Sequence, residues 1–140
     1  MSTFFQSFGF AFRGLADAWR SERNFRVQCA YAATTLGLLV WLRPAAASGL
    51  LVFLGMAVLL AAELMNSALE RAVDLSVTEF HPLARTAKDL AASSVLLIAI
   101  ATAVVNLWVI GSLIAASSQV ALVALLLGLG TFRFAGSETR

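Results

Sequence analysis

Residues 90–132 read LAASSVLLIAIATAVVNLWVIGSLIAASSQVALVALLLGLGTF, a run of 43 residues without a charged side chain. A soluble globule of 14.9 kDa has too little polar surface to cover such a run, so the chain is expected to be an integral-membrane protein. As a single helix, the run would be about 64 Å long, roughly twice the hydrocarbon thickness of a bilayer. We therefore predict a turn within it, at residues 111–112 or 115–119, followed by a candidate fourth membrane helix.

The rest of the chain shows the same separation of apolar runs from charges. Residues 27–42 and 44–62 carry no charge, and most of the charged side chains crowd into residues 13–26 and 63–89. This pattern predicts an all-α membrane bundle with three spanning helices. The first covers about residues 27–42, the second begins near Gly49 and stays helical through Asp74, and the third starts after Asp89. Pro82 predicts a break at residues 78–82 between the second and third helices.

The N-terminus predicts a helix of another kind. An aromatic and aliphatic stripe recurs at helical spacing, while Arg13, Asp17 and Arg20 fall on another face; the stripe consists of Phe5, Phe8, Phe12, Leu15 and Trp19. Such a helix lies in the membrane interface and does not cross the bilayer. We expect a single domain, with the interfacial helix at residues 1–24, a three-helix catalytic core at 25–112 and a hydrophobic extension at 113–140. The interfacial helix could equally serve only as an anchor.

The basic residues indicate the orientation. Four arginines precede the first span, and Arg71, Arg85 and Lys88 lie between the second and third spans, whereas Arg43 is the only basic residue on the other side. The excess of Lys and Arg on cytoplasmic loops predicts a multi-pass cell-membrane protein whose N-terminus and second loop face the cytoplasm. A net charge of +2 gives no reason to expect a nucleic-acid partner.

An acidic stripe, made of Glu63, Asn66, Glu70 and Asp74, follows the second apolar run. Its spacing of 0, 3, 7 and 11 places the four side chains within about an 80° arc of one helix face. Carboxylates at this depth are costly unless they are paired or bind something. The stripe could merely solvate a helix end, or it could serve Mg²⁺, which prefers a few carboxylates together with phosphate oxygens.

Two further features accompany the acidic stripe. Glu22 is a candidate second metal ligand, although an i,i+4 pair with Arg26 is the alternative role that its spacing favours. His81, Arg85 and Lys88 share one helical face just before the third span. A basic face at the membrane surface binds anionic lipid or nucleotide phosphate, and the spacing alone does not distinguish the two.

These segments resemble the signature of the small prokaryotic diacylglycerol kinase family. The resemblance rests on ELMNSALERAVD at residues 63–74, EFHPLA at 79–84 and AKD at 87–89, with SERNFR at 21–26, Gly14 and Trp19 upstream. It covers about residues 8–110, and the ERNFR and HPLA segments look more like the undecaprenol kinase branch. The resemblance implies a homotrimeric membrane lipid kinase with active sites shared between subunits, which phosphorylates undecaprenol or diacylglycerol with ATP and Mg²⁺.

The resemblance also implies roles for individual residues. Glu63 would be the general base, supported by Asn66, and Glu22 and Glu70 would hold the metal. The nucleotide would contact Phe10, Glu22, Glu70, Asp74, Glu79, Phe80, His81, Lys88 and Asp89. The lipid would contact Arg13, Trp19, Phe25, Arg26, Glu63 and Ala92. The sequence departs from the family pattern at Thr3 and Phe10, where the family has a nucleotide-binding arginine and tyrosine.

Two other classes of protein are compatible with four short membrane helices. A small transporter with an embedded glutamate would need that residue near the bilayer midplane, facing a cavity. Here the acidic residues gather toward one side of the membrane, and the centres of the apolar runs have none. A non-catalytic membrane scaffold, whose carboxylates only bind surface cations, is the third class.

Overall fold

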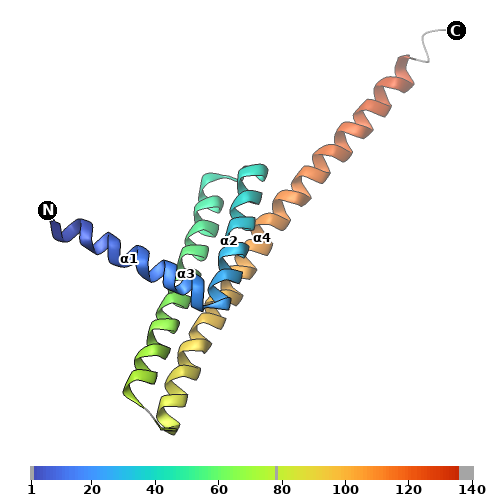
Figure 1. Ribbon diagram of the computed structural model, residues 1–140. Coiled ribbons are helices and arrows are strands. Elements are labelled where there is room, and N and C mark those ends of the chain that lie inside the picture. The colour runs from blue at the N-terminus through green and yellow to red at the C-terminus, as the bar shows by residue number, and fades with distance from the viewer. Residues whose placement is uncertain (1, 78, 136–140) are drawn as a thin grey trace.

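The computed structural model describes the backbone of residues 2–77 and 79–135 and the side chains of residues 5–77 and 79–119. Four helices follow one another: α1 (Ser2–Ser21), α2 (Arg23–Leu42), α3 (Ala46–Ser76) and α4 (Pro82–Ala135). The described part of the chain contains no strand. Helices α2, α3 and α4 form a bundle, and α1 diverges from it at about half the height of α3 (Figure 1). The predicted all-α fold is confirmed.

Helix α1 turns its aromatic stripe away from the bundle. Phe5, Phe12 and Trp19 are each more than half exposed, whereas Ala18, about 100° around the helix from Trp19, is buried. The chain bends sharply at Glu22, where an extended backbone (φ −100°, ψ 111°) separates α1 from α2. The predicted amphipathic helix is therefore present, and the exposure of its apolar face suits contact with lipid.

Three helices are long and apolar enough to cross a membrane: Arg23–Leu42, Ala46–Ser76 and the Pro82–Gln119 part of α4. The three predicted spans are thereby confirmed. Helices α2 and α3 are joined by only three residues, the first of which, Arg43, adopts the left-handed conformation (φ 50°, ψ 60°). The N–H of Arg43 donates to the Leu39 carbonyl at 2.9 Å and closes α2. Helix α4 begins at Pro82, as expected, because proline fits the first turn of a helix.

The predicted turn at residues 111–112 or 115–119 is wrong, because α4 continues as one helix to Ala135. The segment offers the backbone no strong breaker. Its serines satisfy their hydroxyls inside the helix, since Ser112, Ser117 and Ser118 donate to carbonyls three residues earlier at 2.8 Å. A lone Gly111 is tolerated in such a run. The candidate fourth helix is consequently a continuation of α4, which extends beyond the bundle on its own (Figure 1).

The bundle is held mainly by α3 packing along α4. Val52, Met56 and Leu59 of α3 are buried, as are Val95 and Val109 of α4. The two backbones come close at Gly55, where an added Cβ would lie 3.3 Å from Thr102 Cγ2. Thr102 is itself buried, and its hydroxyl lies 3.4 Å from the Gly55 carbonyl oxygen. Glycine therefore allows this close approach, because a side chain at residue 55 would require Thr102 to shift.

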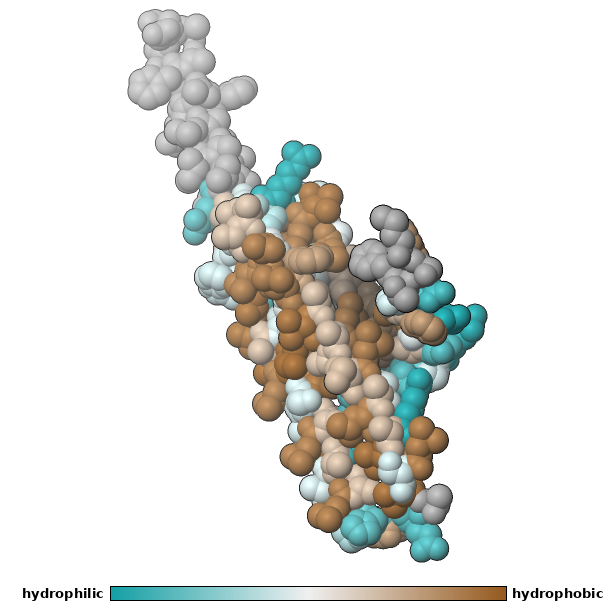
Figure 2. Space-filling view, turned by 90° about the vertical axis from the view of Figure 1, so that its left-hand side faces the viewer, coloured by the Kyte–Doolittle hydropathy of each residue, from teal (hydrophilic) through white to brown (hydrophobic). Residues whose placement is uncertain are grey.

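Most of the outer surface of the helices is hydrophobic. Figure 2 shows brown surface along the bundle, with teal side chains gathered at the end where α3 turns into α4 and on one side of the molecule. An apolar exterior of this extent is costly in water and suits contact with lipid. The polar groups that remain are concentrated in the region described next.

Candidate active site

The innermost polar contact joins α2 to α3. Glu63 lies on α3 directly after the apolar run and is only 4% exposed. The side-chain amide of Gln28 on α2 donates a hydrogen bond from Nε2 to Glu63 Oε2 at 2.9 Å. A buried carboxylate needs such a donor, because removing its charge from water is expensive. Glu63 is thus a buried acidic group held by a neutral partner.

One turn further toward the α3–α4 connection, a second amide holds a second carboxylate. Asn66 Nδ2 donates to Glu70 Oε1 at 2.9 Å. Both side chains are half-buried on the face that also carries Glu63. The predicted stripe therefore exists as one helical face, with Asn66 between the first two carboxylates. Ser67 beside it is also buried.

Two other carboxylates lie within electrostatic reach of Glu63. The negative charges of Glu22 and Glu70 both act on the Glu63 carboxyl group. Among the described residues, however, no three His, Cys, Asp or Glu side chains are close enough to form a metal site by themselves. This arrangement suits an ion whose remaining ligands come from elsewhere, as Mg²⁺ takes phosphate oxygens and water.

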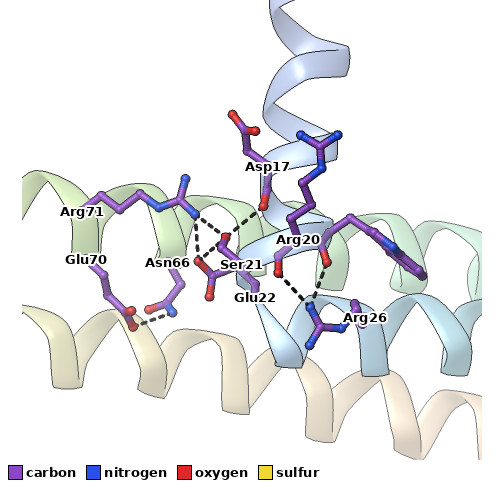
Figure 3. A network of polar contacts seen from close by, with 9 residues as sticks. Asp17, Arg20, Ser21, Glu22, Arg26, Asn66, Glu70 and Arg71 are labelled. Carbon is purple, nitrogen blue, oxygen red and sulfur yellow. Dashed lines mark hydrogen bonds and ion pairs between the residues drawn. The ribbon is translucent and has the colours of Figure 1, made fainter.

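Glu22 connects the α1–α2 junction to α3. Arg71 Nη2 donates to Glu22 Oε1 at 2.9 Å and to Ser21 Oγ at 2.6 Å, and the Ser21 hydroxyl donates to the Asp17 carbonyl at 2.9 Å (Figure 3). Glu22 therefore does not form the i,i+4 pair with Arg26 that its spacing favoured. Arg26 instead donates to the backbone carbonyl of Trp19 at 2.9 Å, because the bend at Glu22 brings the end of α1 over its guanidinium.

A second group of predicted site residues lines a hollow at the α3–α4 connection. The hollow has a volume of about 300 Å³ and lies among the first turn of α4 and the last turns of α3. Its walls include five side chains that the resemblance assigns to the nucleotide: Asp74, Glu79, Phe80, His81 and Lys88. The structure therefore brings together these five residues, which occupy two helices and the loop between them.

Two ion pairs involve the basic face of α4, and only one of them joins it to α3. The Lys88 ammonium forms an ion pair with Asp74 across the two helices. Arg85 and Asp89 pair within α4 at 3.8 Å, with both side chains mostly exposed. The exposed pair contributes little, because water screens it. Lys88 is the better fixed cation, since its side chain is only 34% exposed.

The remaining predicted site residues lie apart from one another within a single chain. Phe10 lies on α1, with the Arg13 guanidinium 4.6 Å from its ring centroid, and both lie away from the acidic stripe. Phe25 is buried at the start of α2, and Ala92 is exposed on α4. Within one chain, the structure does not bring Phe10 to the hollow. Thr3 lies outside the residues whose side chains are described.

Two residues of the site did not emerge from the sequence as site residues. Gln28 holds Glu63 from 35 positions away, and Arg71 holds Glu22 from 49 positions away. The signal for Gln28 was an amide inside an otherwise apolar run, because a polar side chain within a span requires a partner. Arg71 is a basic residue next to Glu70, and in the sequence it served only to predict the orientation of the chain in the membrane.

Comparison with known proteins identifies similar chains. A family model described as prokaryotic diacylglycerol kinase matches residues 9–110. The chain is 38% identical over 109 residues to an undecaprenol kinase of Bacillus subtilis, covering 76% of this chain and 87% of that one. It is 40% identical over 103 residues to a diacylglycerol kinase of Synechocystis, covering 71% and 58%. It is 30% identical over 103 residues to a diacylglycerol kinase of Escherichia coli K12, covering 71% and 84%.

Proposed function

Because this chain belongs to the prokaryotic diacylglycerol kinase family and is a lipid kinase, we propose that it transfers the γ-phosphoryl group of ATP to the hydroxyl of undecaprenol or diacylglycerol. One observation carries the assignment of the site. Glu63 is a buried carboxylate with a neutral partner, and it stands where the apolar part of α3 ends. This position suits a base for the hydroxyl of a lipid that stays in the membrane while ATP approaches from the α3–α4 connection.

In the proposed reaction Glu63 is the general base. Its carboxylate accepts the proton of the lipid hydroxyl while the hydroxyl oxygen forms a bond to the γ-phosphorus, and the bond from that phosphorus to the ADP oxygen breaks. Phosphoryl transfer depends mainly on positioning and on charge neutralisation. A site built from a few carboxylates, an amide and a lysine is therefore sufficient.

Glu22 and Glu70 are the proposed ligands of Mg²⁺. Each carboxylate is engaged through Oε1, by Arg71 and Asn66 respectively, and Oε2 is the atom that can bind a cation. Two carboxylates fit an ion that obtains its other ligands from phosphate and water. When bound, Mg²⁺ neutralises charge on the ATP phosphates. The Arg71 contact fixes Glu22 at the surface of α3, the helix that carries Glu70.

The hollow at the α3–α4 connection is the proposed nucleotide site. Lys88 supplies a cation for phosphate, and His81 and Phe80 supply rings beside it. Glu79 and Asp89 carry acceptors for the hydrogen bonds of the nucleoside. The Asp74 partner holds Lys88 in place until phosphate competes for its charge.

The lipid is proposed to approach along α1. Trp19 is half exposed at the end of this helix, and the bond of Arg26 to the Trp19 carbonyl holds the helix end against α2. Arg13 on α1 and Ala92 on α4 are both exposed, and the resemblance assigns both to the lipid. Phe25, buried beneath the bend, supports the junction rather than an open surface.

Orientation and assembly complete the proposal. We propose that the N-terminus, the acidic stripe and the α3–α4 connection face the cytoplasm, where ATP is available; the bias of Lys and Arg supports this orientation. We propose a homotrimer, since the resemblance implies active sites shared between subunits. Active sites shared between subunits are consistent with the positions of Phe10 on α1 and Ala92 on α4, which lie apart from the rest of the site within one chain. Mass measurement of the purified protein in detergent tests this number.

The decisive experiment is a kinase assay with the full chain purified in detergent. The protein is incubated with labelled ATP, Mg²⁺ and either undecaprenol or diacylglycerol, and the lipid fraction is assayed for label. Label in one lipid identifies the acceptor. The absence of ATP-dependent label with both lipids, in a sample that elutes as a homogeneous oligomer, contradicts the proposal. A sample in which Glu63 is replaced by Gln serves as the matched control.

A further inference from the structure

The contact between Gln28 and Glu63 has a role beyond stabilising the bundle. The two residues come from different spanning helices, and the Gln28 amide meets the carboxylate at 2.9 Å. Glu63 is 4% exposed, so the protein and the lipid, rather than bulk water, determine its surroundings. The orientation of this carboxylate consequently depends on its protein partners.

Gln28 is the hydrogen-bond donor that the structure gives to Glu63. Within residues 5–77 and 79–119, no Lys or Arg forms an ion pair with this carboxylate. A cation at this place would neutralise the carboxylate and compete with the proton that a base must accept. A neutral amide stabilises the charge through its N–H and leaves it in place. The partner is therefore of the kind that a general base requires.

The direction of the Gln28 amide is determined by the same contact. Its Nε2 faces Glu63, and its Oε1 is buried without a hydrogen-bond partner. The reverse orientation would set the amide oxygen against a carboxylate oxygen, which is repulsive. The hydrogen bond engages Glu63 Oε2, so Oε1 of the carboxylate is the atom left to face the substrate hydroxyl. In the same way, the Asn66 amide donates to Glu70, and its carbonyl oxygen is buried without a hydrogen-bond partner.

We propose that Gln28 is a positioning residue for the phosphoryl-transfer reaction, because it aims the Glu63 carboxylate at the lipid hydroxyl. The inference rests on the proposed function, in which Glu63 is the general base. Gln28 touches neither substrate in this scheme and acts only through Glu63. Its loss should therefore lower turnover without weakening the binding of ATP or of the lipid.

Two variants of similar size test the inference. Gln28→Met and Gln28→Leu both remove the donor and keep an apolar side chain in its place. We expect kcat to fall by about 10- to 100-fold in each, the effect of losing one hydrogen bond to a charged group, while KM for both substrates stays within about twofold. Thr34→Val is the matched control, because Thr34 is an exposed polar residue of α2 bonded only to the Ala30 carbonyl. An unchanged kcat in both Gln28 variants overturns the inference, and Gln28→Leu decides alone if Gln28→Met does not yield folded protein.

A double-mutant cycle separates positioning from a general structural effect. Glu63→Asp keeps a carboxylate but shortens it by one methylene, so the Gln28 amide no longer reaches it. In this background Gln28→Met should lower kcat by less than about twofold, since the contact is already lost. Full additivity of the two effects overturns the positioning role, because it shows that Gln28 acts through something other than Glu63.

Glu63→Gln distinguishes failure of this inference from failure of the proposed function. If Glu63→Gln keeps the activity of the unaltered protein, Glu63 is not the base, and both proposals fail. If Glu63→Gln is inactive and both Gln28 variants retain full kcat, the base assignment stands and only the role of Gln28 is refuted. If Glu63→Gln is inactive and the Gln28 variants lose kcat alone, both proposals are supported.

Discussion

Glu63 and Asp74 occupy the same face of α3, eleven residues apart, and they are held in opposite ways. Glu63 is 4% exposed and bonded to a neutral amide, whereas the Asp74 side chain is 65% exposed and paired with the Lys88 ammonium. An exposed ion pair costs little because water stabilises both charges, while a buried carboxylate is most reactive when its charge is stabilised but not neutralised. On the proposed function, the inner end of the stripe serves the chemistry and the outer end serves binding, and this difference in burial and partner fits that division.

The largest effect is expected from the inner end. Glu63→Gln keeps the size of the side chain and removes its ability to accept a proton, so kcat should fall by about 10²- to 10⁴-fold. ATP binding, measured with a labelled nucleotide on the purified protein, should persist because the hollow lies at the other end of the stripe. If Glu63→Gln turns over at nearly the original rate, the inner end of the stripe does not carry the chemistry, and the proposed division of roles is contradicted.

The middle of the stripe is tested by Glu70→Gln. The substitution removes one proposed ligand of Mg²⁺, so the Mg²⁺ concentration at half-maximal activity should rise by about tenfold. Asp17→Asn is the control, because Asp17 is an exposed carboxylate of α1 whose backbone carbonyl, rather than its side chain, accepts from Ser21. Identical Mg²⁺ titrations for Glu70→Gln and the unaltered protein would remove Glu70 from the metal site.

At the outer end, Lys88→Met should change binding more than turnover. Loss of the fixed cation in the hollow should raise KM for ATP by about five- to tenfold, with kcat lowered less than KM is raised. Arg20→Met is the control, since the Arg20 side chain points away from the Glu22–Arg71 contact in Figure 3. If Lys88→Met lowers kcat and leaves KM unchanged, the outer end takes part in chemistry, and the contrast with Glu63 is lost.

The smallest effect is expected far from both ends. A chain that stops after Ser118 loses the part of α4 that extends beyond the bundle, which also lies beyond the family match at residue 110. Its kcat and KM in detergent should stay within about twofold, because no part of the stripe or the hollow is removed. A tenfold loss of activity in a truncated protein that keeps its oligomeric state would give this segment a role in the reaction.

The sequence predicted the helices well because hydropathy and charge are local signals. Residues 23–42, 46–76 and 82–119 follow the uncharged runs, and the break before Pro82 follows from one residue. The turn in the long apolar run was predicted from bilayer thickness, which limits how much of a helix lies in lipid and not how far the helix continues. Ser112 and its neighbours satisfy their hydroxyls within α4, so nothing in the segment ends the helix.

The site could be predicted only in part because its contacts cross between helices. Glu63, Asn66 and Glu70 share a face by helical spacing alone, and the structure keeps them there. The partners of these carboxylates could not be predicted from helical spacing. Spacing alone favoured an i,i+4 pair of Glu22 with Arg26 as the alternative to metal binding, but the bend at Glu22 directs this side chain to Arg71 on another helix. Only the packing of α2 and α3 determines such pairs, and a single sequence does not state that packing.

The three-residue link between α2 and α3 restricts how the chain can change in length. Gln28 stands 15 residues before Arg43, and Glu63 stands 20 residues after it, so the link sets the register in which amide and carboxylate meet. One residue inserted between the link and Glu63 would rotate the carboxylate by about 100° around the axis of α3. We therefore expect related chains to vary freely in composition over this hairpin while keeping its number of residues, and an insertion there to be more damaging than most substitutions.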